Sequence, residues 1–522
     1  MRPCPLCGTP TADAILAAAF NHRDWTRDGG ACPACVQESL LRLLLARGDE
    51  SLHQAVQSVW PLDPEAAFGA LPTPLRLHAD PRFAGRGVTL AVVDSGFHPH
   101  PDLVRRRNRI RAWSDQGRDP GTILRFSAAD EPRWPGWNAA HDHQWHGTMT
   151  SVVAAGDGAS SDGLYRGLAS EAELVLLAVR DGAGHITNES VVRALDWIHA
   201  HHGEFGIRVV NLSLGGDPVE PLAGNPVDRA VRRLTEAGIV VVAAAGNSGA
   251  RHLLPPATAP EALTIGGLDD RSLLDHASAR LWHSNYGETA SGAWKPELVA
   301  PSIWVAAPVL PGTAVSHELA ELFARRRAGD RAGDRGVDGR LAELKAITPH
   351  YQHVDGTSFA APLVASAVAC LLEAHPGLIP ALVRDTLMST AQPVPGADRE
   401  RQGAGVLDAG RAVARALAER HGGAELAGPT IEGDRVRFRL HDHDAATVAV
   451  FGSWDGWTAP VALRTAEPGL WQSEPVPISP GRHDYKLQRN GSRWLDDPAN
   501  PVKRPDGFGG WNSVVEVGDA PP

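Results

Sequence analysis

The sequence VTLAVVD at residues 88–94 is a short, nearly continuous apolar run. Such runs are typical of strands that are buried on both faces of a parallel sheet. Three later segments have the same character: ELVLLAV (173–179), IRVVNLSL (207–214) and GIVVVAAAG (238–246). Segments with helical apolar spacing lie between these runs. Strands that alternate with helices predict a doubly wound α/β domain around a parallel sheet.

The chain is too long for this domain alone. It has 522 residues, whereas one domain usually contains about 100 to 200 residues. After about residue 420 the pattern changes to short alternating strands with turn signals, as in TVAVFGSW at 447–454, which predicts a separate β domain. Residues 317–345 read as two helical pieces around an Arg/Asp/Gly linker, and we expect this insert to be exposed.

The side-chain charges argue against two classes of partner. The chain has 61 acidic and 50 basic side chains and a formal net charge of -11. This balance disfavours binding to nucleic acid or to an anionic membrane. The first residues lack the basic and apolar pattern of a secretion signal, and no apolar run approaches the roughly 18 to 20 residues of a membrane span. We therefore expect a soluble protein of the cytoplasm.

Four of the five cysteines form two closely spaced pairs, Cys4 and Cys7 in CPLCG and Cys32 and Cys35 in CPACV. Each pair can present two thiolates to one ion, so the two pairs together suit a tetrahedral zinc site. Residues 1–36 resemble a small zinc ribbon, which implies a structural zinc because four protein ligands leave no open position. Two disulfides or idle thiols are the alternative, but disulfides fit poorly with a cytoplasmic protein.

Three polar residues stand where reactive groups gather in such an α/β domain, at the carboxyl ends of the strands. Asp94 ends the first apolar run, His146 begins a small-residue helix in HQWHGTMTSVVAAG, and Ser358 begins an apolar helix in DGTSFAAPLVASAVACLL. A serine hydroxyl becomes a nucleophile when an imidazole takes its proton, and a carboxylate then holds the imidazole in the right tautomer. The set therefore predicts nucleophilic acyl transfer.

The segments DSG, HGT and GTSxAxP, in the order Asp, His, Ser, resemble those of the subtilisin-like serine proteases, the subtilase family. The resemblance covers about residues 75 to 415. It implies a serine endopeptidase in which Asp94 orients the imidazole, His146 is the general base and acid, and Ser358 is the nucleophile. Calcium is frequent in this family, but no dense run of carboxylates marks a site here, and calcium is left open.

Two further segments agree with this resemblance. Asn247 in AAAGNSG matches the family's side-chain donor to the oxyanion, and the backbone N–H of Ser358 would be the second donor. NLSLGG matches the family's substrate-binding strand. We therefore expect Ser213, Leu214 and Gly215 to pair with an extended peptide or protein substrate by β-augmentation.

Tryptophans are concentrated at the C-terminal end, where about the last hundred residues hold five of the 15. The segments FGSWDGW, GRHDYKLQRNGSRWLDDPANP and GGWNSVVEV resemble the glycogen-binding module of the AMP-activated protein kinase β subunit and related family 48 carbohydrate-binding modules. The resemblance implies an immunoglobulin-like β-sandwich. In it Trp457 and Trp494 would stack on glucose rings of an α-glucan, and Lys486 and Asn512 would bond to hydroxyls. A sandwich that holds the tryptophans in its core and contacts only protein is an equally weighted alternative.

These patterns predict four regions. They are a zinc ribbon (1–36), a helical connector or propeptide-like segment (37–86), a subtilisin-like peptidase domain (87–416) and a glycogen-binding-like β-sandwich (428–518). The expected function is that of a cytoplasmic serine endopeptidase whose terminal modules choose the substrate or location. Two other functions stay open: a maturation protease of narrow specificity whose β domain binds protein, and a non-catalytic α-glucan-binding scaffold.

Overall fold

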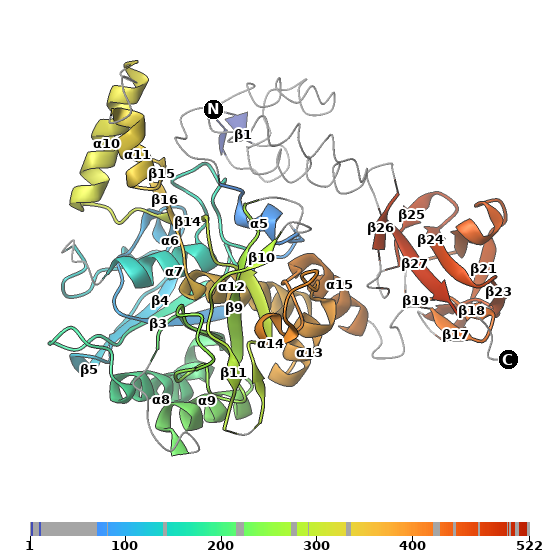
Figure 1. Cartoon of the computed structure of the whole chain (residues 1–522), viewed down its shortest axis with the longest axis horizontal. Helices are drawn as coiled ribbons and strands as arrows, with labels where there is room; N and C mark the ends of the chain where they lie inside the picture. Colours follow the sequence, from blue (N-terminus) through green and yellow to red (C-terminus); the bar gives the residue numbers. More distant parts are fainter. Residues whose placement is uncertain are drawn as a thin grey trace. The chain divides into compact units, whose positions relative to one another are not determined.

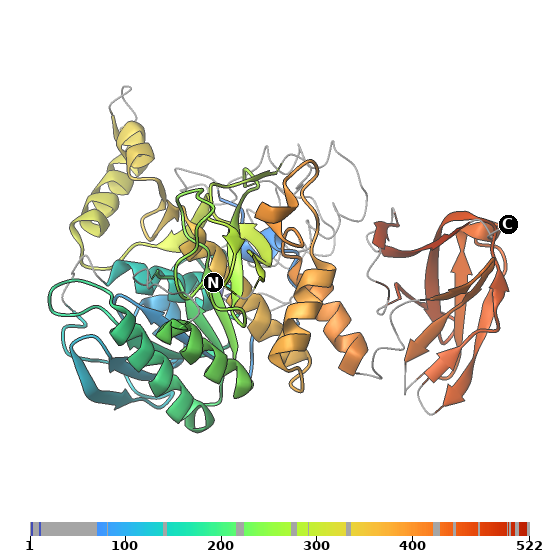
Figure 2. The same cartoon turned by 60° about the horizontal axis from the view of Figure 1, so that its bottom comes forward.

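The computed structural model describes most of the chain from residue 70 on and two short stretches before it. The described residues are 2–3, 10–11, 70–80, 82–138, 144–215, 224–272, 279–290, 292–329, 336–420, 429–441, 445–467, 470–497, 500, 503–506 and 511–518. From residue 70 on they divide into two compact units, one ending at Ala409 and the other beginning at Gly410. Figure 1 labels the elements, and Figure 2 shows them from a second direction.

The first unit is built on a nine-stranded sheet. The four predicted apolar runs form its strands β3 (Thr89–Asp94), β6 (Glu173–Ala178), β7 (Ile207–Leu212) and β8 (Val240–Ala244), so this prediction is confirmed. The remaining strands are β4 (Ile110–Asp115), β5 (Asp119–Arg125), β9 (Leu263–Asp269), β10 (Arg280–Leu281) and β13 (Leu298–Pro301). The order is β10-β9-β8-β7-β3-β6-β4-β5, with β13 beside β9. Among these described strands, β5 and β10 pair antiparallel and the others pair in parallel.

The position of β3 between β6 and β7 determines where the site forms. From β3 the chain first adds β4 and β6 on one side, and then crosses over to add β7, β8 and β9 on the other side. The loops that leave the carboxyl ends of β3 and β7 therefore diverge, and such a point is where open α/β sheets bind their ligands. Asp94 ends β3, and Ser213 directly follows β7.

Four helices cover this sheet (Figures 1 and 2). The helices α8 (Asn188–Phe205) and α9 (Pro226–Glu236) contact each other and the strands β7 and β8, respectively. The helices α7 (Trp145–Ala155) and α12 (Thr357–Ala374) also contact each other, and α12 contacts β7, β8 and β9. One described helix, α12, is long and apolar enough to cross a membrane, but 89% of it is buried inside the unit. A helix that is buried on all sides is apolar all round, so α12 is a core helix.

Further elements complete the first unit. Its other helices are α5 (Thr73–Arg76), α6 (Pro101–Val104), α10 (Ala314–Arg327), α11 (Val337–Glu343), α13 (Pro380–Thr390) and α14 (Arg399–Gln402). Its other strands are β1 (Arg2–Pro3), β2 (Pro10–Thr11), β11 (Gly287–Glu288), β12 (Trp294–Lys295), β14 (Val305–Pro308), β15 (Ala346–Thr348) and β16 (Tyr351–Val354). Helix α15 (Ala409–Arg420) begins at the boundary between the units.

The insert that we expected to be exposed has a small core of its own. Leu319, Leu322 and Phe323 of α10 are buried, and they pack with Leu341 of α11. Residues at this spacing lie on one face of a helix, so two adjacent helices can bury them against each other. The prediction of an exposed insert was therefore wrong for the facing sides of these helices. The middle of the predicted linker, residues 330–335, lies outside the described residues.

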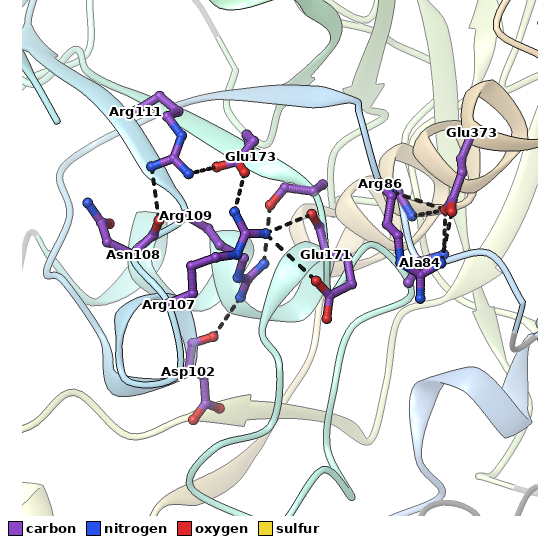
Figure 3. A network of polar contacts seen from close by, with 12 residues as sticks. Ala84, Arg86, Asp102, Arg107, Asn108, Arg109, Arg111, Glu171, Glu173 and Glu373 are labelled. Atoms are coloured by element: carbon purple, nitrogen blue, oxygen red, sulfur yellow. Dashed lines mark hydrogen bonds and ion pairs between the residues drawn. The ribbon is translucent and has the colours of Figure 1, made fainter. Parts of the chain in front are cut away.

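A carboxylate near the end of α12 fixes the segment that leads into β3. Glu373 accepts hydrogen bonds from the backbone N–H groups of Ala84, Gly85 and Arg86, at 2.7, 2.7 and 3.0 Å (Figure 3). It also pairs with the guanidinium of Arg86. Charge-assisted hydrogen bonds of this kind are among the stronger polar contacts in proteins. The contact ties together the two elements that carry the first and last predicted catalytic residues.

The second unit consists mainly of short antiparallel strands. They are β17 (Thr430–Glu432), β18 (Arg435–Arg437), β19 (Arg439–His441), β20 (Val448–Gly452), β21 (Val461–Glu467), β22 (Leu470–Gln472), β23 (Val476–Pro477), β24 (Gly481–Arg489), β25 (Arg493–Leu495), β26 (Lys503–Pro505) and β27 (Trp511–Val517). One sheet has the order β17-β18-β23, and the other has the order β19-β22-β21-β20-β24-β27-β26, with β25 beside β24. Buried side chains of both sheets, including Val436, Val450 and Leu487, share one apolar core. This arrangement agrees with the predicted β domain.

Candidate active site

Asp94 is buried at the end of β3 and is only 1% exposed. Its Oδ1 accepts a hydrogen bond from the backbone N–H of Ser95 at 2.7 Å, and its Oδ2 accepts one from the hydroxyl of Thr150 at 3.1 Å. Nδ1 of His146 lies 2.8 Å from Oδ1 and 3.0 Å from Oδ2. A carboxylate held in this way keeps the imidazole proton on Nδ1, which leaves Nε2 free to accept a proton.

Gly147 allows His146 to approach this carboxylate. A Cβ atom on Gly147 would lie 2.3 Å from the carbonyl oxygen of Gly96 and 3.0 Å from the Cβ of Asp94. Only a hydrogen atom fits there, so the start of α7 can lie directly against the turn that follows β3. The imidazole of His146 keeps 22% of its surface exposed and is therefore reachable from solvent.

The environment of His146 shifts its affinity for protons. Burial of the imidazole lowers its pKa, but the charge of Asp94 and the hydrogen bond to that carboxylate together raise it by more, so the pKa lies above the ordinary histidine value. The imidazolium that forms when His146 takes a proton is thus stabilised. This is the electrostatic requirement for a general base next to a serine nucleophile.

Ser358 lies in the first turn of α12, where the helix dipole favours negative charge. Its hydroxyl donates to the carbonyl of Ser213 at 3.4 Å, and its own carbonyl accepts from the hydroxyl of Ser213 at 2.7 Å. The ring of the next residue, Phe359, lies 5.8 Å from the ring of His146. The fold thus brings Ser358 next to the segment after β7, and it brings the adjacent residue Phe359 next to His146.

Asn247 follows β8 and is exposed beside the start of α12. Its Oδ1 accepts hydrogen bonds from the backbone N–H of Thr357 at 3.0 Å and from the hydroxyl of Thr357 at 2.7 Å. Because both bonds use Oδ1, they fix which way the amide points and leave the two N–H donors of Nδ2 for another acceptor. A Cβ at Gly356 would lie 3.4 Å from Nδ2, so this nitrogen faces the turn before Ser358.

The predicted substrate-binding segment directly follows β7. Ser213 and Leu214 are buried, whereas Gly215 is exposed. Ser213 is fixed by the bonds to Ser358 and by a hydrogen bond from Asn211 at 2.9 Å. The structure therefore places Ser213 beside Ser358, with Leu214 and Gly215 next in the chain.

Two residues of the site were not predicted, Thr150 and Thr357. Thr150 lies four residues after His146 in a helix and therefore on the same face, so the sequence contained a signal for it. The contact of Thr357 with Asn247 joins residues 110 positions apart. No local pattern indicates such a pair.

The predicted zinc ligands Cys4, Cys7, Cys32 and Cys35 lie outside the described residues. Among the residues that the structure does describe, no group of three or more His, Cys, Asp or Glu side chains is suited to hold a metal ion. The fifth cysteine, Cys370, is buried in α12, and burial raises the pKa of its thiol. It is a core residue rather than a reactive thiol.

The four predicted carbohydrate-binding residues lie in the second unit. Lys486 is opposite Phe451, and Trp494 is opposite Gln488, so Lys486 and Trp494 share the face of the sheet that points away from the core residues Tyr485 and Leu487. Trp494 is 47% exposed, and its ring lies 4.9 Å from that of Phe451.

The other two candidates differ in exposure. Asn512 is 8% exposed and donates to Asp484 at 3.3 Å, on the same face as Lys486. Trp457 is half-buried after a short helical turn, in a left-handed backbone conformation with a φ of 66°. The ammonium group of Lys486 is paired with Asp506.

The peptidase unit has counterparts among known proteins. Residues 85–405 match the model of the family described as the subtilase family. The chain belongs to the subtilase family. Its matched region is thus a serine endopeptidase domain, in agreement with the resemblance of the DSG, HGT and GTSxAxP segments.

Two subtilases illustrate the likeness. The serine protease AprX of Bacillus subtilis is 29% identical over 339 residues, a match that covers 63% of this chain and 66% of AprX, just under two thirds of its length. Subtilisin Savinase of Lederbergia lenta is 28% identical over 308 residues, which cover 59% of this chain and 84% of Savinase. The crystal structure of fervidolysin from Fervidobacterium pennivorans, described as related to subtilisin, matches 78% of this chain and 53% of its own, with 22% identity and a TM-score of 0.45.

Proposed function

We propose that the whole protein is a serine endopeptidase in which Asp94, His146 and Ser358 form the catalytic triad and Asn247 donates to the oxyanion. The observation that carries this proposal is the contact of His146 Nδ1 with both oxygens of the buried Asp94 carboxylate, at 2.8 and 3.0 Å. This contact prepares Nε2 to accept a proton. Peptides and proteins are the proposed substrates.

The reaction follows from these groups. Oγ of Ser358 attacks the carbonyl carbon of the scissile peptide bond while Nε2 of His146 takes the hydroxyl proton. The negative oxygen that forms receives hydrogen bonds from Nδ2 of Asn247 and from the backbone N–H of Ser358. The C–N bond then breaks as His146 gives the proton to the leaving amine. Water attacks the acyl-enzyme through the same relay, which releases the acid and restores Ser358.

Peptides blocked at both ends test this function. A mixture of N-acetylated, C-amidated fluorogenic peptides should be cut internally by the full-length protein, because an endopeptidase needs neither a free amine nor a free carboxylate. Gly215 and its neighbours would bind the peptide backbone as an added strand. Failure to cut any blocked peptide, with the protein shown to be folded, would contradict the proposal.

We further propose that Cys4, Cys7, Cys32 and Cys35 bind one structural zinc ion. Strands β1 and β2 pair antiparallel, and in sequence they flank the segment that contains the first two cysteines, as expected for a hairpin that presents one ligand pair. Purified full-length protein should contain one equivalent of zinc, and Cys4→Ser should lower this content. Metal-free wild-type protein, purified without chelator, would show the proposal to be wrong.

A second function is favoured by one sheet face of the β unit, on which Trp494 is exposed. This face points away from the apolar core of the unit. It carries the indole of Trp494, the ring of Phe451 and the polar groups of Lys486 and Asn512. Flat apolar rings beside hydrogen-bonding groups are what a sugar ring requires. We propose that this face binds an α-glucan such as glycogen.

Sedimentation with glycogen tests the glucan proposal. Replacing Trp457 and Trp494 by alanine should reduce the affinity about tenfold or more, because buried aromatic contacts often dominate a binding site. Trp294→Ala is the matched control, since Trp294 is 41% exposed but belongs to the peptidase unit. Retention that is unchanged in the double variant would instead favour the alternative in which this face contacts protein, as in a maturation protease of narrow specificity.

Location in the cytoplasm, without nucleic acid or membrane partners, stays a prediction from the sequence.

A further inference from the structure

The loop that carries Asn247 is held by a segment that is distant in sequence. The loop begins at Gly246, whose φ of +102° is a conformation that L residues rarely adopt. The backbone N–H of Asn285 donates to the carbonyl of Gly246 at 3.0 Å, and the backbone N–H of Tyr286 donates to the carbonyl of Ala250 at 3.1 Å. The two ends of the loop are therefore tied to two consecutive residues.

The side chain of Asn285 fixes the middle of the same loop. Its Oδ1 accepts hydrogen bonds from the backbone N–H of Ser248 at 2.8 Å and from the hydroxyl of Ser248 at 2.7 Å. Its amide also lies against Gly246, since a Cβ at Gly246 would be 2.7 Å from Nδ2 of Asn285. Asn285 is only 7% exposed, so its side of these bonds is shielded from water.

We infer that Asn285 is a positioning residue for the oxyanion donor. It contacts the residues on both sides of Asn247, while Thr357 holds Oδ1 of Asn247 from the other direction. The backbone on both sides of Asn247 is thus held by Asn285, and Thr357 sets the rotation of the Asn247 amide and also accepts a hydrogen bond from the backbone N–H of Gly246 at 3.1 Å. An oxyanion donor acts only when its N–H lies about 3 Å from the developing negative charge, so a small shift of this loop removes most of its effect. This inference rests on the proposed function.

Steady-state kinetics on a blocked peptide that the wild type cleaves test the inference. Asn285→Leu, which keeps the number and branching of the side-chain heavy atoms but removes the acceptor, is expected to lower kcat on the order of 10- to 100-fold. KM should change by less than about threefold, because the lost interaction is made in the transition state. Asn285→Asp keeps an oxygen acceptor for Ser248 and should retain kcat within about fivefold of the wild type.

A double-mutant cycle separates positioning from general loss of structure. In the background of Asn247→Ala, Asn285→Leu should lower kcat by less than about threefold, because the donor that it positions is already absent. Asn108→Leu is the matched control. Asn108 is a buried asparagine of the same unit that donates to the carbonyl of Ser127 and accepts from the backbone N–H of Ile110. Its replacement should leave kcat within about twofold of the wild type. If Asn285→Leu does not fold, Ser248→Ala replaces it in the cycle and should couple to Asn247 in the same way.

The outcomes distinguish this inference from the function on which it rests. A wild type that cleaves no peptide contradicts the proposed function itself. An active wild type in which the effect of Asn285→Leu, or of Ser248→Ala, is the same with and without Asn247 contradicts the positioning role. Loss of kcat in Asn285→Leu together with retention in Asn285→Asp and loss of coupling in the Asn247→Ala background supports it.

Discussion

Replacement of Ser358 by alanine is expected to lower kcat for peptide hydrolysis by about 10⁶, the size of the loss that removal of the nucleophile causes in subtilisin. The variant retains the oxyanion donors and the substrate-binding segment, so KM should change little and a weak residual rate over water should remain. Hydrolysis of a blocked fluorogenic peptide, compared at equal concentrations of folded protein, measures this effect.

Ser366→Ala is the matched control for this substitution. Ser366 lies in the same helix, is buried, and donates its hydroxyl to the carbonyl of Leu363 at 2.6 Å. Its replacement removes one hydroxyl from α12 without touching the site, so kcat should stay within about twofold of the wild type. If Ser358→Ala kept more than about a tenth of the wild-type rate, Ser358 could not be the nucleophile.

Replacement of Asp94 by asparagine is expected to lower kcat by about 10⁴, because an amide no longer holds the imidazole proton on Nδ1. The same substitution changes the pH dependence. Protonated His146 cannot accept the proton of Ser358, so kcat/KM of the wild type should fall as the pH decreases through the pKa of His146. Asp94 raises that pKa and burial lowers it. Without the carboxylate, the acid limb of the profile should therefore move to lower pH.

Asp228 provides the control for the origin of the acid limb. Burial raises the pKa of Asp228 to about 6, so this carboxyl group titrates in the same pH range as a histidine. Its Oδ1 accepts from the hydroxyl of Thr258, and within the described part of the chain the hydrogen bonds of Asp228 are to Asn225 and Thr258 rather than to Asp94, His146 or Ser358. Asp228→Asn should leave the kcat/KM profile unchanged. A profile that moves with Asp228→Asn but not with Asp94→Asn would contradict the assignment of the limb to His146.

The central part of the fold could be predicted because its signal is local. The run at 88–94 and its three counterparts are apolar at nearly every position, and this is the direct consequence of burial on both faces. The strands β5 and β10 at the sheet edges are short or exposed and lack that signal. The insert around α10 and α11 was misjudged because its charged residues dominate its composition, while the few apolar side chains that form its core are spread over two helices.

For the candidate site, the sequence could predict only those residues whose positions follow from the chain order and the parallel topology of the sheet. Asp94, His146 and Ser358 belong to elements that a doubly wound sheet brings to one edge, so their proximity follows from their positions after strands and at helix starts. The residues that hold these catalytic groups in place could not be predicted in this way. Thr357 and Asn285 act through side-chain contacts with the loop after β8, across 110 and 37 positions, and such contacts depend on packing rather than on any repeating pattern.

Covalent labelling with a fluorophosphonate tests the central claim most directly. The reagent phosphonylates a serine hydroxyl only when a base has activated it and oxyanion donors can receive the phosphoryl oxygen. The account predicts that folded wild-type protein takes up one equivalent, that peptide mass spectrometry places the adduct on Ser358, and that Ser358→Ala and heat-unfolded wild type remain unlabelled. A folded wild type that takes up no label, or an adduct on a serine other than Ser358, would contradict it.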